Sequence, residues 1–273
     1  MIAAILVLYF TKMGMNIRRK SPQKHDMDMV FGIRALIEAI KAGKTIDKIF
    51  TQKGLKNPLI SELYDLIDDR DIPNSKVPVE KLNRITTKNH QGAIGFISPV
   101  DFASLDNVVM NAFEKGEDPF ILILDRITDV RNFGAIARTA ECAGVHGILV
   151  PTKGAAQIGA DAMKTSAGAL NYLSVCREHN LKEAIMQLKE SGLKVFACTE
   201  KSAEVVYDAN LSGPVAIIMG SEEDGVSPAY QQLCDGAVKI PMQGKIDSLN
   251  VSVATAVVVY EVVRQRGVLD VRC

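Results

Sequence analysis

Asp125–Arg138 is a polar segment whose residue types could bind a ligand. It follows an apolar run and opens a stretch of helical periodicity, and ligands of open α/β sheets bind where the strands end. Asn132 stands where a helix N-cap is expected, Gly134 leaves room for a ligand beside the helix, and Arg138 follows four residues later. The same pattern fits an ordinary capped helix with a surface arginine, so this segment needs support from others.

A second polar segment, Met219–Ser227, places Gly220 and Gly225 on either side of three acidic residues. Glycine at position 220 suits a close approach of the backbone to a ligand. The three carboxylates would repel a phosphate, so a sugar or a positively charged ligand fits the segment better. The alternative interpretation is a plain polar turn.

The third candidate segment runs from Lys239 to Gly244 and continues at Ser248–Asn250. Pro241 lacks a backbone donor and should end the preceding strand. Ser248 and Asn250 are natural N-capping residues for the helix that follows. Their side chains could equally hydrogen-bond a ribose or a base, so capping and ligand binding both stay open.

Several common enzyme signatures are absent from the sequence. There is no G-x-G-x-x-G after the first strand of this region, no G-x-x-x-x-G-K-[ST] and no G-x-S-x-G. The four histidines show no relay with a nucleophile. A nicotinamide or flavin oxidoreductase, a P-loop enzyme and a serine hydrolase are therefore disfavoured.

The three segments lie in a region that alternates strands and helices. Apolar runs predict strands at 121–124, 147–150, 194–197, 215–219 and 237–240, with helices at 133–143, 181–190 and 228–233. Continuous apolar strands indicate a parallel sheet that is covered on both faces. The last segment, Asn250–Gln265, is rich in valine, but it lacks Gly and Pro and repeats its apolar residues at helical spacing, which predicts a helix.

The preceding region predicts a smaller α/β unit. Helical spacing predicts helices over 31–42, 58–69 and 78–82, and β-rich runs predict strands at 46–51 and 93–97. The polar stretch that ends in Gly-Glu-Asp-Pro before residue 120 indicates a linker. We therefore expect an N-terminal arm at 1–26, a first domain at 27–103, a linker at 104–118 and a second domain at 119–273.

Composition and charge limit the class of protein. Of the 273 residues, 47% are hydrophobic and 23% are charged, which is typical of a globular chain and not of a disordered, collagen-like or polytopic membrane protein. Residues 1–105 hold 16 basic and 11 acidic residues, a net charge of +5, and the remainder has a net charge of −5. An anionic partner for the first half is one interpretation, and chance partition is the other.

The cysteines and the N-terminus bear on location. The five cysteines form no C-x-x-C pair, and no Cys/His cluster has zinc spacing, so we expect free thiols, no metal and a cytoplasmic protein. The apolar run Met1–Phe10 is too short to cross a bilayer and lacks the flanks of a secretory signal, so no membrane partner is expected. Because Met13 and Met15 follow closely, we expect that the residues before them can come from an upstream start codon.

Together the three segments resemble the SpoU/TrmH family of RNA ribose 2′-O-methyltransferases, within the SPOUT superfamily. The shared pattern is Asn132-x-Gly134-x-x-x-Arg138, then Gly220-Ser221-Glu222 with Gly225, then Ile240-Pro241-Met242 with Ser248-Leu249-Asn250. The segment Lys164–Ala169 also matches the family. This resemblance covers Pro119 to about Gly267, and the first region resembles the family's small substrate-binding domain.

The resemblance implies a mostly parallel α/β sheet whose C-terminal part is threaded as a trefoil knot, although general topology rules predict none. It gives the first domain a ribosomal-protein-like α/β fold. It also implies a homodimer, in which the first segment of one subunit faces the cofactor of the other. RNA is the implied partner, and His90-Gln91-Gly92 matches the 23S rRNA guanosine members. The expected reaction is methyl transfer to a guanosine 2′-hydroxyl of 23S rRNA.

The implied cofactor is S-adenosylmethionine, with contacts at Gly220, Ile240 and Leu249. The implied catalytic residues are Arg138, Asn132, Glu222, Ser248 and Asn250. The pKa of arginine exceeds about 12, so Arg138 fits better as a clamp on an RNA phosphate and a stabiliser of the developing alkoxide than as a general base. Asn132 would position Arg138 or the ribose, and the other three would hold the loops and the target nucleoside.

Three other interpretations stay open. The first is a 2′-O-methyltransferase that acts on tRNA or on another rRNA site. The second is a catalytically silent RNA-binding protein that keeps the scaffold. The third is a nucleotide-binding oxidoreductase, which the missing glycine fingerprint disfavours. Binding of S-adenosylmethionine but not NAD would separate the third from the methyltransferases.

Overall fold

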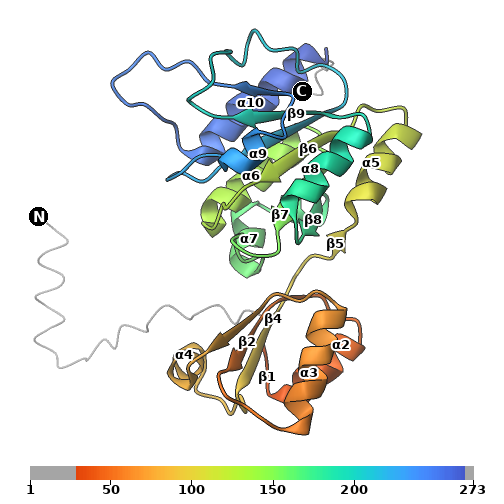
Figure 1. Ribbon diagram of the computed structural model, residues 1–273, viewed down its shortest axis with the longest axis vertical. Coiled ribbons are helices and arrows are strands. Elements are labelled where there is room, and N and C mark those ends of the chain that lie inside the picture. The colour runs from red at the N-terminus through yellow and green to blue at the C-terminus, as the bar shows by residue number, and fades with distance from the viewer. Residues whose placement is uncertain (1–28, 268–273) are drawn as a thin grey trace, which may run out of the picture.

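A computed structural model describes residues 29–267 of the chain (Figure 1). The expected N-terminal arm, at 1–26, lies outside the described residues. Figure 1 shows two α/β units that follow one another along the chain, the small one at the bottom of the view and the large one at the top. The loops of the large unit position the candidate site.

The small unit is a four-stranded sheet with helices on both faces. Its strands are β1 (Met29–Phe31), β2 (Ile46–Gln52), β3 (Asn74–Val77) and β4 (Ala93–Ile97), in the order β1-β4-β2-β3. Helices α2 (Ile33–Lys41) and α3 (Pro58–Asp69) pack on one face, and α4 (Val79–Ile85) packs on the other. The helices and strands predicted for this region are confirmed. The sequence did not reveal β1 and β3, because strands of three or four residues carry no clear period.

The large unit is a seven-stranded sheet with the order β11-β9-β10-β6-β7-β8-β5. Every pair of neighbouring strands is parallel, as the continuous apolar runs predict. The strands are β5 (Phe102–Ala103), β6 (Phe120–Leu124), β7 (Gly147–Pro151), β8 (Ser174–Glu178), β9 (Lys194–Cys198), β10 (Val215–Met219) and β11 (Gly236–Val238). Central strands β6 and β10 are buried along their whole length. Strand β8 was not predicted, because its sequence Ser-Val-Cys-Arg-Glu is largely polar.

Helices cover both faces of this sheet. One apolar core includes α6 (Val130–Cys142), α7 (Ala160–Thr165), the 3-10 turn Ala169–Asn171 and α10 (Val251–Gln265). The other includes α5 (Leu105–Glu114), α8 (Leu181–Glu190) and the flank of α9 (Pro228–Gln231). The C-terminal helix is confirmed: the Asn250 side chain caps α10, and Val258 and Val262 are fully buried. Burial of this face outweighs the strand preference of valine.

The expected linker at 104–118 is wrong, because most of this segment forms helix α5. Its buried residues Leu105, Val108, Val109 and Ala112 recur at helical spacing and pack into the second core. The polar residues of the segment lie on the outer face of the helix, and they gave it the average polarity of a linker. Strand β5, just before α5, already pairs with β8 of the large sheet.

An ion pair joins the two units. Arg177 on β8 donates to the side chain and to the backbone carbonyl of Asp47 on β2, and its guanidinium stacks on the Phe102 ring at 3.6 Å. Both partners are nearly excluded from water, with exposed side-chain fractions of 10% and 4%. Burial raises the pKa of Asp47 and lowers the pKa of Arg177, because it penalises both charges, while each partner offsets part of that penalty.

We expect the change Arg177→Met to lower the free energy of unfolding by about 3 kcal/mol, because it leaves the Asp47 carboxyl group buried without its partner. The double variant Asp47→Asn/Arg177→Met should recover part of this loss, since no charge then stays buried. Urea unfolding of the wild type, both single variants and the double variant would measure the coupling. If the losses in free energy of unfolding of the two single variants were strictly additive in the double variant, the Asp47–Arg177 pair would contribute no coupling between the two units.

The loop between β9 and β10 contacts the C-terminal part of the chain at two places. At one end, Thr199 donates to the Val238 carbonyl, and Lys239 exchanges backbone hydrogen bonds with Glu204 and Val206. At the other end, the Gln265 side chain bonds the backbone of residues 209 and 211, and Arg266 donates to the carbonyl of residue 213. A C-terminal knot, which the resemblance implies, would place an earlier loop against the last strand and helix in this way.

Candidate active site

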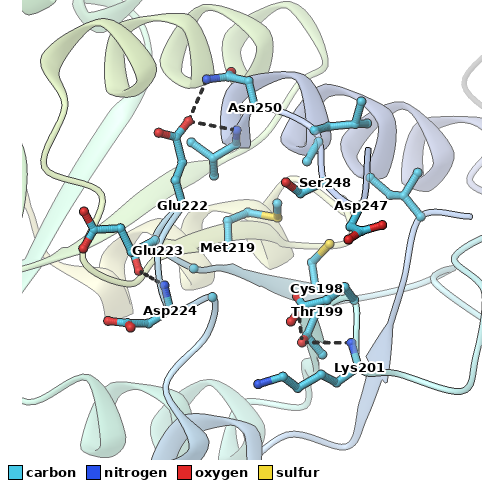
Figure 2. A pocket seen from close by; sticks show the side chains of 18 of the residues that line it. Cys198, Thr199, Lys201, Met219, Glu222, Glu223, Asp224, Asp247, Ser248 and Asn250 are labelled. Atoms are coloured by element: carbon cyan, nitrogen blue, oxygen red, sulfur yellow. Dashed lines mark hydrogen bonds between the residues drawn. The ribbon is translucent and has the colours of Figure 1, made fainter. Parts of the chain in front are cut away.

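A cavity of about 660 Å³ opens at the carboxyl ends of β9, β10 and β11 and at the start of α10 (Figure 2). Six of the eight residues predicted for the site line it: Gly220, Glu222, Ile240, Ser248, Leu249 and Asn250. The residues that line the cavity at the end of β9, Cys198–Lys201, were not predicted from the sequence. The signal was available, because this segment also follows a buried strand at the same edge of the sheet.

Three of the predicted residues form one hydrogen-bonded cluster. Oε1 of Glu222 accepts from Nδ2 of Asn250 at 2.7 Å and from Nδ2 of Asn132 at 3.1 Å. Asn250 Nδ2 also donates to Oδ1 of Asn132 at 3.0 Å. Figure 2 shows Glu222 reaching from its loop to Asn250 at the start of α10. The cluster therefore ties the loop of residues 220–226, which we call the acidic loop, to the N-termini of α6 and α10, where a carboxylate is electrostatically favoured.

Asn132 is not the N-cap of α6, contrary to the prediction. Asp129 caps this helix, and its Oδ1 accepts from the backbone N–H groups of Arg131 at 2.9 Å and Asn132 at 2.8 Å. Asn132 lies in the first turn instead. Its side chain is therefore available to Glu222 and Asn250, which is a stronger reason for an asparagine here than capping.

Both glycines that were expected to make room for a ligand are explained by contacts within the chain. A Cβ on Gly220 would lie 2.0 Å from the carbonyl carbon of Gly225 and 2.1 Å from the nitrogen of Val226. A Cβ on Gly134 would lie 2.3 Å from Oγ1 of Thr165, so this glycine allows α6 to pack against α7. Gly220 thus shapes the cavity by closing the acidic loop tightly on itself.

A further pair of residues, Asp125 and Arg126, anchors that loop. Arg126 donates from Nε and Nη2 to the carboxylate of Asp125, from Nη1 to Asp224 at 2.9 Å, and from Nη2 to the Gly225 carbonyl at 3.0 Å. Asp125 is 1% exposed and accepts from the Ser227 backbone N–H at 2.7 Å. Arg126 has a φ of +57°, a strained backbone value for arginine. Its side chain nevertheless reaches the acidic loop at Asp224 and Gly225.

The cavity favours a positively charged ligand. Five carboxylates line it, at Glu200, Glu222, Glu223, Asp224 and Asp247, against one ammonium group at Lys201. This agrees with the prediction made for the acidic loop. Burial raises the pKa of the Cys198 thiol to about 11, so this side chain is not a nucleophile at neutral pH.

Arg138 and Ser248 stand apart from the cluster. Arg138 is exposed on α6, does not line the cavity, and forms no ion pair within residues 29–267. Ser248 lines the cavity but is exposed, and α10 is capped by Asn250 and not by Ser248. The structure thus unites Asn132, Glu222 and Asn250, and leaves Arg138 free to meet a partner.

Comparison with known families decides what kind of protein this site belongs to. A model of the SpoU rRNA Methylase family matches residues 119–260, and a model for RNA 2′-O ribose methyltransferase substrate binding matches residues 29–103. The chain belongs to the SpoU methylase family. A putative TrmH family tRNA/rRNA methyltransferase of Bacillus subtilis is 34% identical over 245 residues, which cover 90% of this chain and 98% of that protein. A relative with the same description from Staphylococcus aureus is 35% identical and covers 87% of this chain and 96% of its own length.

Solved structures of SpoU methylases share this fold. The crystal structure of the SpoU methyltransferase AviRb from Streptomyces viridochromogenes, in complex with AdoMet, aligns with a TM-score of 0.54 at 24% identity, over 87% of this chain and 89% of that one. The crystal structure of an RNA 2′-O ribose methyltransferase aligns with a TM-score of 0.51 at 26% identity, over 87% and 88%. The expected SPOUT-type α/β fold and its small N-terminal domain are therefore confirmed.

The described residues, 29–267, contain no group of three or more His, Cys, Asp or Glu side chains placed to hold a metal ion. None of the helices in the same range is long and apolar enough to cross a bilayer.

Proposed function

We propose that this SpoU methylase transfers a methyl group from S-adenosylmethionine to the ribose 2′-hydroxyl of a guanosine in 23S rRNA. The observation that carries the proposal is the acidic cavity whose rim holds the Asn132–Glu222–Asn250 cluster. A family domain for binding the RNA substrate precedes it in the same chain. We also expect the protein to work in the cytoplasm, since the four cysteines within residues 29–267 are free thiols.

The cavity residues fit S-adenosylmethionine in charge and in hydrogen bonding. Bound there, this cofactor supplies a methyl group on a positively charged sulfur, and the surrounding carboxylates stabilise that charge. Within the described chain, the backbone N–H groups of Gly220, Ile240 and Leu249 donate no hydrogen bond, so they are free for an adenine or its ribose. The side chains of Ile240 and Leu249 supply apolar walls, as small-molecule pockets require.

The ribose has to reach the methyl group with its hydroxyl activated. The cluster of Asn132, Glu222 and Asn250 fixes the acidic loop relative to the N-termini of α6 and α10. These elements would therefore position the reactants without rearranging at each turnover. Arg138 would clamp an RNA phosphate and stabilise the alkoxide that forms as the hydroxyl proton passes to a nearby phosphate oxygen of the RNA. Because Arg138 does not line the cavity of its own subunit, we propose that it acts at the cavity of a second subunit.

A homodimer would bring the two halves of this site together. The outer face of α10 carries Val253, which is 49% exposed, and Tyr260, which is 51% exposed, on a helix that begins at the cavity. We expect Val253→Glu/Tyr260→Glu to give a monomer that binds S-adenosylmethionine and transfers no methyl group. Light scattering and a transfer assay would measure both. A control pair of changes in exposed residues on the outer faces of α5 and α8, Met110→Glu/Met186→Glu, should leave a dimer.

The RNA substrate is tested by methyl transfer to separate pools. Labelled S-adenosylmethionine would be offered with unmodified large-subunit rRNA, small-subunit rRNA or tRNA. We expect label in large-subunit rRNA, on one guanosine. Label in tRNA is the second candidate, because the relatives are described as tRNA/rRNA methyltransferases. Cofactor binding without transfer to any pool would support a silent RNA-binding protein and contradict the proposal.

A further inference from the structure

The two faces of the small unit differ in charge, because carboxylates and basic residues are mixed on the side of α2 and α3, whereas basic residues predominate around α4. Helix α3, on one face, carries four carboxylates, at Glu62, Asp65, Asp68 and Asp69, and no basic residue. On the other face, α4 and its surroundings present Lys48, Lys81, Arg84 and Lys88 against one carboxylate of α4, Glu80. We call this second group the α4 face. Residues 29–105 hold 11 basic and 9 acidic residues, a net charge of +2, so the rest of the +5 counted for residues 1–105 lies in the sequence before the small unit.

The alternation of strand β2 places the basic residues on this face. Ile49 belongs to the core beneath α2 and α3, whereas Phe50 packs in the separate core beneath α4. Lys48 is two residues from Phe50 and therefore points to the same side of the sheet. The Phe50 ring also meets the buried Phe96 ring edge-on, with centroids 5.8 Å apart. This contact fixes the orientation of the ring over which Lys48 and Lys81 lie.

Aromatic rings hold the three lysines in place. The ammonium groups of Lys48 and Lys81 lie 4.8 and 5.0 Å from the centroid of the Phe50 ring. Lys88 lies 5.0 Å from the centroid of Phe31 on β1. None of the three forms an ion pair within the described part of the chain; on the opposite face Lys41 pairs with Glu62 at 2.7 Å, and one lysine, Lys76, lies over the Tyr64 ring at 4.5 Å. Cation–π contacts orient a charge without neutralising it.

We propose that the α4 face is the surface on which the small unit grips RNA, with Lys48, Lys81 and Lys88 each contacting a phosphate. This rests on the proposed function for the nature of the partner. Three positioned and unpaired ammonium groups suit the regularly spaced phosphates of an RNA backbone, and each neutralised phosphate releases counterions. The four carboxylates of α3 would repel the same backbone, which favours an approach of the RNA from the α4 side.

The test compares two triple variants that remove the same charge from opposite faces. One is Lys48→Gln/Lys81→Gln/Lys88→Gln. The matched control is Arg34→Gln/Lys44→Gln/Lys56→Gln, which changes exposed residues on the side of α2 and α3. Affinity of the full-length protein for fluorescent 23S rRNA fragments would be measured across a salt series without cofactor. We expect the first variant to bind at least about 30-fold more weakly and to lose about two units of the salt slope. The control should stay within about threefold of wild type.

A third variant separates charge from folding. Lys48→Arg/Lys81→Arg/Lys88→Arg keeps the charge and the contacts with aromatic rings, so it should bind RNA within about threefold of wild type. Equal weakening by the two glutamine triples, with methyl transfer intact, would overturn this inference and leave the proposed function standing. If only the glutamine triple of the α4 face bound RNA more weakly, and the wild type transferred no methyl group, the proposed function alone would be overturned. Binding of polyglutamate in place of RNA would show that the α4 face serves an acidic protein partner, contrary to the inference.

Discussion

Replacing Gly220 with alanine is expected to abolish binding of S-adenosylmethionine. The new Cβ would lie 2.0–2.3 Å from backbone atoms of Gly225 and Val226, closer than any real Cβ contact. Because those atoms belong to the backbone and not to a flexible side chain, the acidic loop itself has to move. We expect the Kd of the cofactor, measured by calorimetry, to rise at least about 100-fold.

The same substitution at Gly244 provides the control. Gly244 lies in the loop that follows β11, and a Cβ there would meet its nearest neighbour, the nitrogen of Ile246, only at 4.0 Å. Gly244→Ala should therefore leave the cofactor Kd within about threefold of wild type. If Gly220→Ala bound the cofactor as tightly as Gly244→Ala, the tight closure of residues 220–226 would not be what shapes the cavity.

The second large effect is expected for Arg138→Ala. Removing a group that stabilises developing negative charge costs about 100- to 1,000-fold in kcat. Cofactor binding should be unchanged, because Arg138 does not line the cavity of its own subunit. The control is Arg131→Ala, which removes another exposed arginine of α6. A loss of less than about threefold in kcat for Arg138→Ala would exclude the clamp.

Mixing the two defective variants tests whether Arg138 acts across the dimer. A mixed dimer of Gly220→Ala and Arg138→Ala subunits would contain one intact site, formed by the cavity of the second subunit and the arginine of the first. Activity should return on mixing and exceed that of either variant alone. If mixing restores nothing although mixed dimers form, Arg138 acts within its own subunit.

The sequence predicted the alternating elements well, because the apolar runs of β6 and β10 and the helical spacing of α2 and α3 are strong local signals. It failed where a segment depends on its surroundings. The polar outer residues of α5 concealed its buried stripe at Leu105, Val108 and Ala112. Strand β8 is largely polar, and one of its polar residues is Arg177, which serves the contact between the two units.

The site shows the same division between local and distant information. The loops after β10 and β11 could be selected from their glycines and polar residues, and six predicted residues do line one cavity. The reason for each residue could not be predicted, because it depends on distant partners. Asn132 is 90 residues from Glu222 in the sequence, and Arg126 reaches Asp224 and Gly225 across about the same distance. Only the fold brings these pairs together.

The most direct test of the proposed chemistry is to identify the methylated atom. Large-subunit rRNA would be incubated with the protein and labelled S-adenosylmethionine, then digested to nucleosides and analysed by mass spectrometry. We predict that the label appears in a single nucleoside, guanosine carrying the methyl group on its ribose 2′-oxygen, and that Arg138→Ala lowers its yield by about 100-fold or more. Label on a base, or label on ribose that is unaffected by the loss of Arg138, would contradict the mechanism proposed for this site.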